Sequence, residues 1–89
     1  MATHTHTREV MARLARIEGH VGAIKRMVEA NRPCPEVLVQ ISAVRAALDK
    51  VAKVLLADHM EHCVLESLQD GDAEKHLQAL REALERFIA

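Results

Sequence analysis

VLVQISAVRAALDKVAKVLL, residues 37–56, is the stretch that decides the fold. Apolar residues recur in it in alternating steps of four and three, at Val37, Ile41, Val44, Leu48, Val51 and Leu55. This spacing places an apolar stripe along one side of an α-helix and is typical of helices that pack in a bundle. No glycine or proline interrupts the helical pattern up to about Leu68, so the stretch predicts an unusually long helix for a small domain.

Two further helices are predicted on either side of this one. The first runs from about Thr7 to Ala30 and the third from about Asp72 to Ile88. The connector NRPCPE separates the first two, because proline cannot donate the hydrogen bond of an inner helical turn; the long helix should therefore begin near Cys34. The first segment repeats the pattern of fours and threes, at Val10, Leu14, Ile17, Val21, Ile24 and Val28.

Glycines contribute one stop signal and one packing signal. Gly71 is expected to end the long helix. Gly19 and Gly22 lie inside the first helix, where each costs roughly 1 kcal/mol relative to alanine, so a close approach by a neighbouring helix is expected to offset that cost.

Composition predicts an all-α fold with three helices per chain. Phe87 is the single aromatic residue, and three glycines and two prolines leave too little turn chemistry for several β-hairpins. We expect one domain, residues 7–89, preceded by a flexible tail, residues 1–6. A chain of 89 residues leaves much of its surface uncovered unless partners cover it, so an oligomer is expected.

The N-terminal sequence MATHTHTREV has no apolar segment of the kind found in signal peptides, and no apolar run approaches the roughly 18 residues of a membrane span. We therefore expect a cytoplasmic protein with no membrane partner. In that reducing compartment Cys34 and Cys63 are expected to form a metal site or a redox pair rather than a structural disulfide.

Histidine and cysteine gather near the end of the long helix. His59 and Cys63 are four residues apart and point the same way on a helix. Cys34 lies 25 positions before His59, which is roughly 38 Å along the same helix, so one chain cannot close a site. Two copies of the helix placed antiparallel about a two-fold axis would bring Cys34 to the partner's ligands, with small residues near the crossing: Ala43, Ala46 and Ala47.

Two thiolates and one imidazole form a soft ligand set with few members, which favours Cu(I), or Zn(II) or Ni(II) if further ligands join. An alternative is that Cys34 and Cys63 are small buried apolar residues and that His59 lies on a charged surface. His62 points about 100° away from Cys63 on a helix and is expected to be exposed rather than ligating.

Three segments, RLARIEGHVGAIKRMVE, RPCPEVLVQISAVRAALDKV and DHMEHCV, resemble the CsoR/RcnR family of metal- and thiol-responsive repressors. The resemblance covers nearly the whole chain and implies metal ligands at Cys34, His59 and Cys63, a set similar to that of the copper-sensing branch. It also implies a disc-shaped tetramer, a dimer of antiparallel four-helix dimers. Such a tetramer binds operator DNA when metal-free and releases it on Cu(I) binding, which frees copper-efflux or sequestration genes.

The chain departs from the copper-sensing pattern at two positions next to the ligands. Copper sensors of this family usually have tyrosine before the first cysteine, where this chain has Pro33. A glutamate of the third helix is expected to support the site, and Glu82 is the candidate for that position. These departures concern the coupling between metal and DNA more than the ligand set.

Basic residues concentrate in the first third of the chain. Residues 1–32 hold six Lys and Arg against three Glu, whereas residues 33–70 hold three against six acidic residues. By the resemblance, the DNA-contacting positions are Arg13 and Lys50, and Arg16 lies one turn from Arg13. The alternative to a DNA-binding face is that half or more of these basic residues are ordinary solvated surface charges. No helix-turn-helix or zinc-finger spacing is visible, so contacts through phosphates and groove shape are expected.

His4 and His6 are possible extra metal ligands, because an N-terminal histidine joins the metal site in the nickel branch of the family. The alternative is a frayed polar tail. A nickel or cobalt sensor, a persulfide sensor and a copper storage or chaperone protein remain alternatives to a copper-responsive repressor. No arrangement typical of an enzyme active site is present, and no protein substrate is expected.

Overall fold

The computed structural model describes residues 6–88, apart from the side chains of residues 63–68, 70 and 73. These residues form three α-helices: α1 (Thr7–Glu29), α2 (Cys34–Asp70) and α3 (Ala73–Ile88). The prediction of an all-α chain with three helices is confirmed, and every helix end lies within two residues of its predicted position. Nothing in the described helices is both long enough and apolar enough to cross a membrane.

Helix α1 ends in a left-handed turn at Asn31, whose φ is 56°. The N–H of Arg32 donates to the carbonyl of Met27 at 3.0 Å, and the N–H of Asn31 donates to the carbonyl of Val28 at 3.1 Å. This pair of bonds is a Schellman motif, which satisfies carbonyls that the last helical turn leaves without partners. Asparagine tolerates the left-handed conformation better than most residues, so it stops α1 one residue before the predicted end.

Proline, glycine and aspartate define the remaining helix ends. The carbonyl of Pro33 accepts from the N–H of Glu36 at 3.0 Å and so opens α2. Gly71, with φ of 72°, ends α2 as predicted. Oδ1 of Asp72 accepts from the N–H of Lys75 at 3.2 Å, so Asp72 caps α3 and the helix begins one residue after it.

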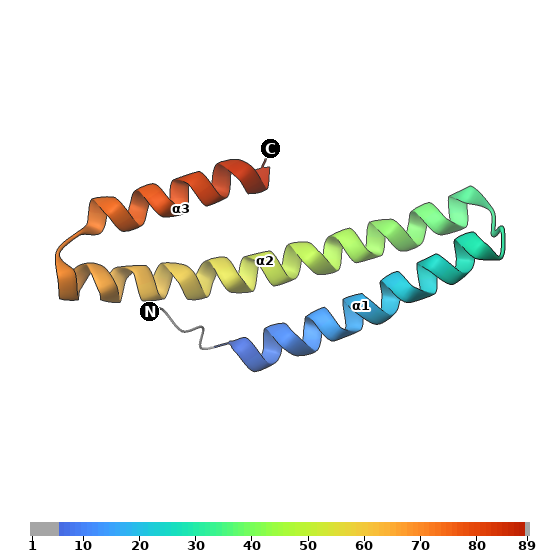
Figure 1. Ribbon diagram of the computed structural model, residues 1–89, viewed down its shortest axis with the longest axis horizontal. Helices are drawn as coiled ribbons and strands as arrows, with labels where there is room; N and C mark the ends of the chain where they lie inside the picture. The colour runs from blue at the N-terminus through green and yellow to red at the C-terminus, as the bar shows by residue number, and fades with distance from the viewer. Residues whose placement is uncertain (1–5, 89) are drawn as a thin grey trace.

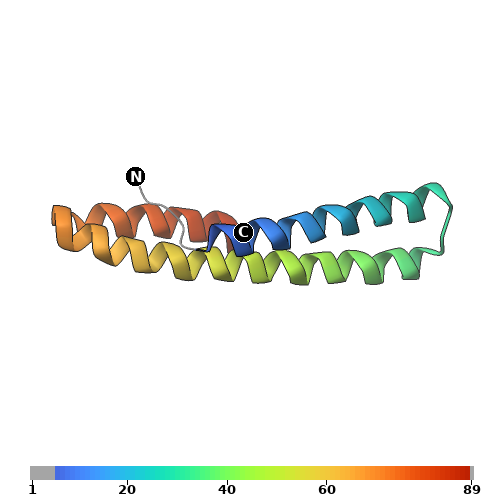
Figure 2. The same ribbon diagram turned by 90° about the horizontal axis from the view of Figure 1, so that it is seen from below.

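The three helices form a long, shallow molecule of 56 × 27 × 14 Å (Figure 1). Helix α1 runs antiparallel to α2, and α3 turns back along the C-terminal part of α2 on the other side (Figures 1 and 2). Within the part of the chain that the structure describes, α1 and α3 each pack on α2 and do not contact one another. Each outer helix therefore has a single neighbour, and much of its surface stays open.

The apolar stripe of α1 and α2 divides into two rows with seven-residue spacing. One row, which we call the inner row, is buried or half-buried and comprises Val10, Ile17, Ile24, Val37, Val44 and Val51. Five of the six alternate members, which we call the open row, are between 36% and 58% exposed and comprise Leu14, Val21, Val28, Ile41 and Leu48. The sixth, Leu55, is half-buried in the wall of a cavity between α2 and α3. The contact between α1 and α2 thus covers only every second apolar position that the sequence pattern supplies.

The close helix contact predicted at the glycines of α1 is absent within the chain. A Cβ atom added to Gly19 would meet nothing within 4 Å, and one added to Gly22 would meet the guanidinium of Arg26 at 3.6 Å. The single chain therefore gives no packing reason for Gly19.

Val51→Ala is expected to lower the free energy of unfolding by about 1–3 kcal/mol, because Val51 is 4% exposed and its truncation leaves a cavity in the inner row. Denaturant unfolding at one fixed protein concentration measures the change. Val39, 66% exposed on the same helix and outside both rows, is the matched control, and Val39→Ala should change stability by less than about 0.5 kcal/mol. Equal losses in the two variants would contradict the division into rows.

Candidate functional site

The predicted metal ligands lie far apart on one continuous helix. Cys34 is the first residue of α2, and its thiol is free and exposed. His59 follows 25 residues later in the same helix, roughly 38 Å away at 1.5 Å per residue. Cys63 lies in α2 four residues beyond His59, and its side chain falls outside the described part of the structure. One chain therefore does not bring Cys34 to His59.

His59 belongs to the contact between α2 and α3. It is half-buried in the wall of a cavity of about 380 Å³ between the two helices. Helix α3 contributes an apolar wall to this cavity, which includes Leu80, Leu84 and Phe87. A change in the position of the imidazole would therefore alter the packing of α3 on α2.

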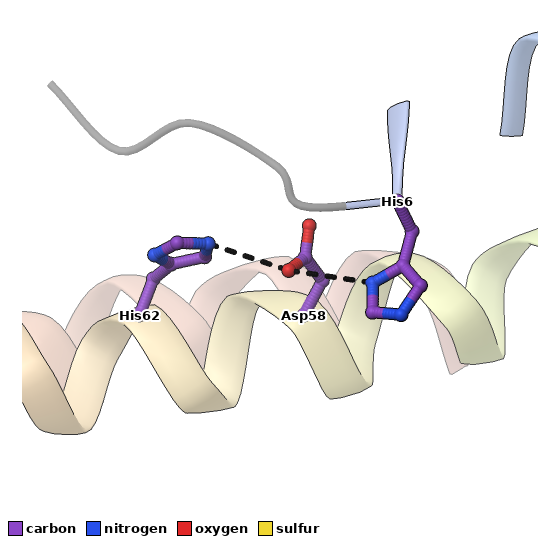
Figure 3. Close-up of polar contacts among 3 residues, drawn as sticks. All are labelled: His6, Asp58 and His62. Carbon is purple, nitrogen blue, oxygen red and sulfur yellow. Dashed lines mark ion pairs between the residues drawn. The ribbon is translucent and has the colours of Figure 1, made fainter. Parts of the chain in front are cut away.

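Asp58 forms a buried polar cluster with two histidines on a different side of α2. Asp58 is 1% exposed as a whole residue, and its side chain is fully buried. Nδ1 of His6 lies 3.6 Å from Oδ1 of Asp58, and Nε2 of His62 lies 3.3 Å from the same oxygen (Figure 3). His6 immediately precedes α1, so the cluster joins the start of α1 to the segment of α2 that carries His59 and Cys63.

Asp58 occupies the next position of the inner row. It follows Val51 by seven residues, just as Val51 follows Val44. A carboxylate in an apolar contact loses its hydration, a cost that polar neighbours must offset, and the two imidazoles supply such neighbours. The sequence analysis missed Asp58, because its seven-residue spacing from Val51 marks it as buried only once the structure shows which row α1 covers.

The expectation that His62 is exposed is wrong, because its side chain is only 18% exposed and is turned toward Asp58. Its Nε2 atom is buried and makes no hydrogen bond of normal geometry among the described residues, and its contact with Oδ1 of Asp58 is an ion pair when the imidazole is protonated. His62 is one turn after Asp58 on α2, which is why the two side chains share a face.

The predicted DNA-binding residues lie on the exposed sides of α1 and α2. Arg13 and Arg16 line a second hollow of about 420 Å³, together with Ile17, His20 and Ala47. Lys50 is exposed on α2, one turn after Ala47. The hollow therefore presents two guanidinium groups beside the contact of α1 with α2.

Two polar contacts influence this basic surface. Glu9 Oε1 accepts from Nε of Arg13 at 3.2 Å and lies 3.1 Å from its Nη2. The carboxylate of Glu9 therefore forms an ion pair with the guanidinium of Arg13. Nε2 of His20 lies 2.8 Å from Oε1 of Gln40, a part-buried hydrogen bond that ties the middle of α1 to α2. A phosphate that binds Arg13 would compete with Glu9.

The remaining predicted site residues lie elsewhere. Glu82 is exposed on α3 and accepts from Nε2 of Gln78 at 3.1 Å, and it is not among the residues that line the cavity beside His59. His6, which was assigned to a flexible tail, lies against Asp58. His4 lies outside the described residues.

Residues 6–88 match the family model described as metal-sensitive transcriptional repressor. The chain belongs to the CsoR family of metal-sensitive transcriptional repressors. It is 46% identical over 79 residues to the copper-sensing transcriptional repressor CsoR of Bacillus subtilis strain 168, an alignment that covers 89% of this chain and 78% of that protein.

Two solved structures of CsoR-like repressors share the fold. The copper-sensing repressor CsoR with Cu(I) from Geobacillus thermodenitrificans NG80-2 has a TM-score of 0.89 and 40% identity, and the match covers 100% of this chain and 93% of that chain. The nickel-responsive transcriptional regulator InrS has a TM-score of 0.79 and 47% identity, with 98% and 96% covered.

Membership in the CsoR family confirms the predicted class of protein. The chain is a metal-sensing transcriptional repressor and not an enzyme. Membership in this family implies binding to operator DNA and to metal ions. Its similar proteins include both copper-sensing and nickel-responsive repressors.

Arg13→Ala is expected to weaken operator binding and to lower the slope of log affinity against log salt by about one for each Arg13 that contacts a phosphate. Fluorescence anisotropy titrations of operator DNA at several salt concentrations measure both quantities. Glu9→Gln should have the opposite effect and tighten binding by up to about fivefold, because the competing carboxylate is removed.

Arg81→Ala is the matched control, since Arg81 is exposed on α3 and the change removes the same charge. It should leave the salt slope near its original value. An unchanged operator titration for Arg13→Ala would exclude Arg13 from the DNA contacts.

Proposed function

We propose that this repressor senses Cu(I) in the cytoplasm. It binds operator DNA when metal-free and releases it when Cu(I) is bound, which derepresses copper-efflux or sequestration genes. The observation that carries the proposal is the placement of a thiol at one end of α2 and an imidazole–thiol pair near the other end of the same continuous helix. The similarity to repressors named for copper sensing supports the choice of metal.

The open row supports an antiparallel dimer with shared sites. A two-fold axis at Leu48, which is 46% exposed, sets that leucine against its own copy and sets Ile41 against Leu55 of the partner subunit. The same register places Cys34 opposite position 62 of the partner, between the two positions predicted to ligate metal. One arrangement of four helices would therefore both cover the open row and bring the predicted metal ligands together.

The donor set fits Cu(I) as the effector. Cys34, His59 and Cys63 would supply two thiolates and one imidazole, and soft ligands in small number suit this ion. Ni(II) favours additional nitrogen ligands, for which His4 and His6 are the candidates. Because His6 lies against Asp58, the structure favours the three-ligand set over one that includes His6.

Two such dimers would form the disc-shaped tetramer, with Arg13, Arg16 and Lys50 facing the phosphates of the operator. The coupling is a shift between two arrangements of the protein, because a ligand that binds both equally changes neither population. His59 lines the cavity between α2 and α3, so its recruitment as a ligand would change how α3 packs. The arrangement that holds metal would then match the operator less well.

An operator-binding assay with different effectors tests the proposal. Anisotropy titrations are run on the metal-free protein and repeated with Cu(I), Ni(II), Zn(II) and a persulfide donor. We expect Cu(I) to weaken operator binding between about fivefold and 150-fold, the usual range of coupling between two sites. His59→Ala should keep operator binding and lose the Cu(I) response.

Each other outcome selects another function. Release by Ni(II) but not Cu(I) would indicate a nickel sensor, and a persulfide response that survives in His59→Ala would indicate a thiol sensor. Tight Cu(I) binding without any operator binding would indicate storage or delivery of copper.

A subunit-mixing experiment tests the shared site. Cys34→Ala and Cys63→Ala should each lose tight Cu(I) binding, since each lacks one ligand in both sites of its dimer. When the two variants are unfolded together and refolded, mixed dimers regain one complete site out of two. Cu(I) titration against a competing chelator measures this recovery, and a mixture that recovers nothing would contradict a site built between subunits.

A further inference from the structure

We propose that Asp58 is a positioning residue that couples the metal-ligand segment of α2 to the start of α1. Its carboxylate holds His6 and His62 together, so movement of the ligand segment is passed to the helix that carries Arg13 and Arg16. This inference rests on the proposed function, because it concerns how metal binding alters DNA binding.

Burial and geometry identify Asp58 as more than a surface charge. The residue is 1% exposed, and both imidazoles approach the same oxygen, at 3.6 Å from His6 and 3.3 Å from His62 (Figure 3). Nε2 of His62 is buried without a hydrogen bond among the described residues, which makes its contact with Asp58 sensitive to small displacements. When an imidazole of the cluster is protonated, its attraction to the buried carboxylate is screened less than that of an ion pair at the surface.

The two partners on α2 are chain neighbours of the predicted ligands. Asp58 precedes His59, and His62 precedes Cys63. Successive residues on a helix point about 100° apart, so this segment presents two faces at once. His59 lines the cavity against α3, whereas Asp58 contacts His6, the residue that immediately precedes α1. Rotation or displacement of the segment on metal binding must therefore move both contacts.

Helix α1 provides a stiff connection from His6 to the basic surface. His6 directly precedes the first residue of α1, and Arg13 and Arg16 follow within three turns. The hydrogen bond between His20 and Gln40, at 2.8 Å, ties α1 to α2 beyond these arginines. Arg13 and Arg16 therefore lie between two polar contacts of α1 with α2, one from His6 to Asp58 and one from His20 to Gln40. A shift of the first contact would reorient both arginines relative to α2.

The role proposed for Asp58 is to transmit the response between α2 and the start of α1.

The test measures the ratio of operator dissociation constants with and without Cu(I). Asp58→Asn keeps the shape of the side chain and removes its charge, and we expect it to bring this ratio down to less than about twofold. Operator affinity of the metal-free protein and Cu(I) affinity should each stay within about threefold of the original. Glu61→Gln, an exposed residue of the same segment, is the matched control and should keep the full ratio.

A double-variant cycle separates coupling from a purely structural role. His6→Ala should reduce the ratio as Asp58→Asn does, and the combined variant should show no further loss, because both changes break the contact between His6 and Asp58. A ratio that stays intact in either single variant would overturn the inference. Loss of Cu(I) affinity in His6→Ala would also overturn it, because it would make His6 a ligand.

Hydrogen exchange provides a readout if Asp58→Asn fails to fold. His6 has a side chain that is 48% exposed, so His6→Ala leaves the core intact. Cu(I) should change the exchange of amides in the first turns of α1 in the original protein and not in His6→Ala. The same change in both proteins would overturn the inference.

The original protein is measured first, which separates this inference from the proposed function. If Cu(I) does not release its operator, the proposed function fails. If Cu(I) releases the original protein and releases Asp58→Asn equally well, only the role of Asp58 fails.

Discussion

The packing of α1 on α2 through a single row of valines and isoleucines is the interaction on which the rest of the structure depends. It covers positions spaced by seven, among them Val10, Val44 and Val51, and leaves the alternate positions exposed. Apolar area removed from water stabilises a fold in proportion to its size, so a chain with so small a core is poorly stabilised alone. The exposed row and the separated ligands both point to a partner. Helix α1 covers only one apolar row of α2, and a continuous helix cannot bring its two ends together.

The same row explains how a charge enters the core. Asp58 stands where a fourth apolar residue of α2 would continue the contact, and the chain supplies His6 and His62 beside it. An apolar residue there would pack without a cost of desolvation, so the carboxylate is difficult to explain by stability. A polar contact is directional, however. It therefore joins the part of α2 that carries His59 and Cys63 to α1 more specifically than an apolar contact would.

The surface charges of this chain are unevenly distributed. The net charge of the chain is −1, yet residues 1–32 carry an excess of three positive charges. Exposed ion pairs such as Arg13 with Glu9 contribute little to stability in water. If Arg13 contacts DNA as predicted, phosphates would compete with the carboxylate of Glu9 for the same donors, so the ion pair would affect how available the guanidinium is.

Sequence periodicity by itself determined the three helices, their order and, within two residues, their ends, because helix formation depends on local spacing and on stop signals such as Gly71. Residue type and spacing also predict Cys34, His59 and Cys63 as metal ligands, and this assignment stays a prediction. Only the tertiary structure showed which apolar row packs within the chain. It also showed that His62 turns toward Asp58 and that Glu9 forms an ion pair with Arg13. A helix pattern alone does not say which neighbour lies against which face, so a buried aspartate and a solvated one look the same until α1 is in place.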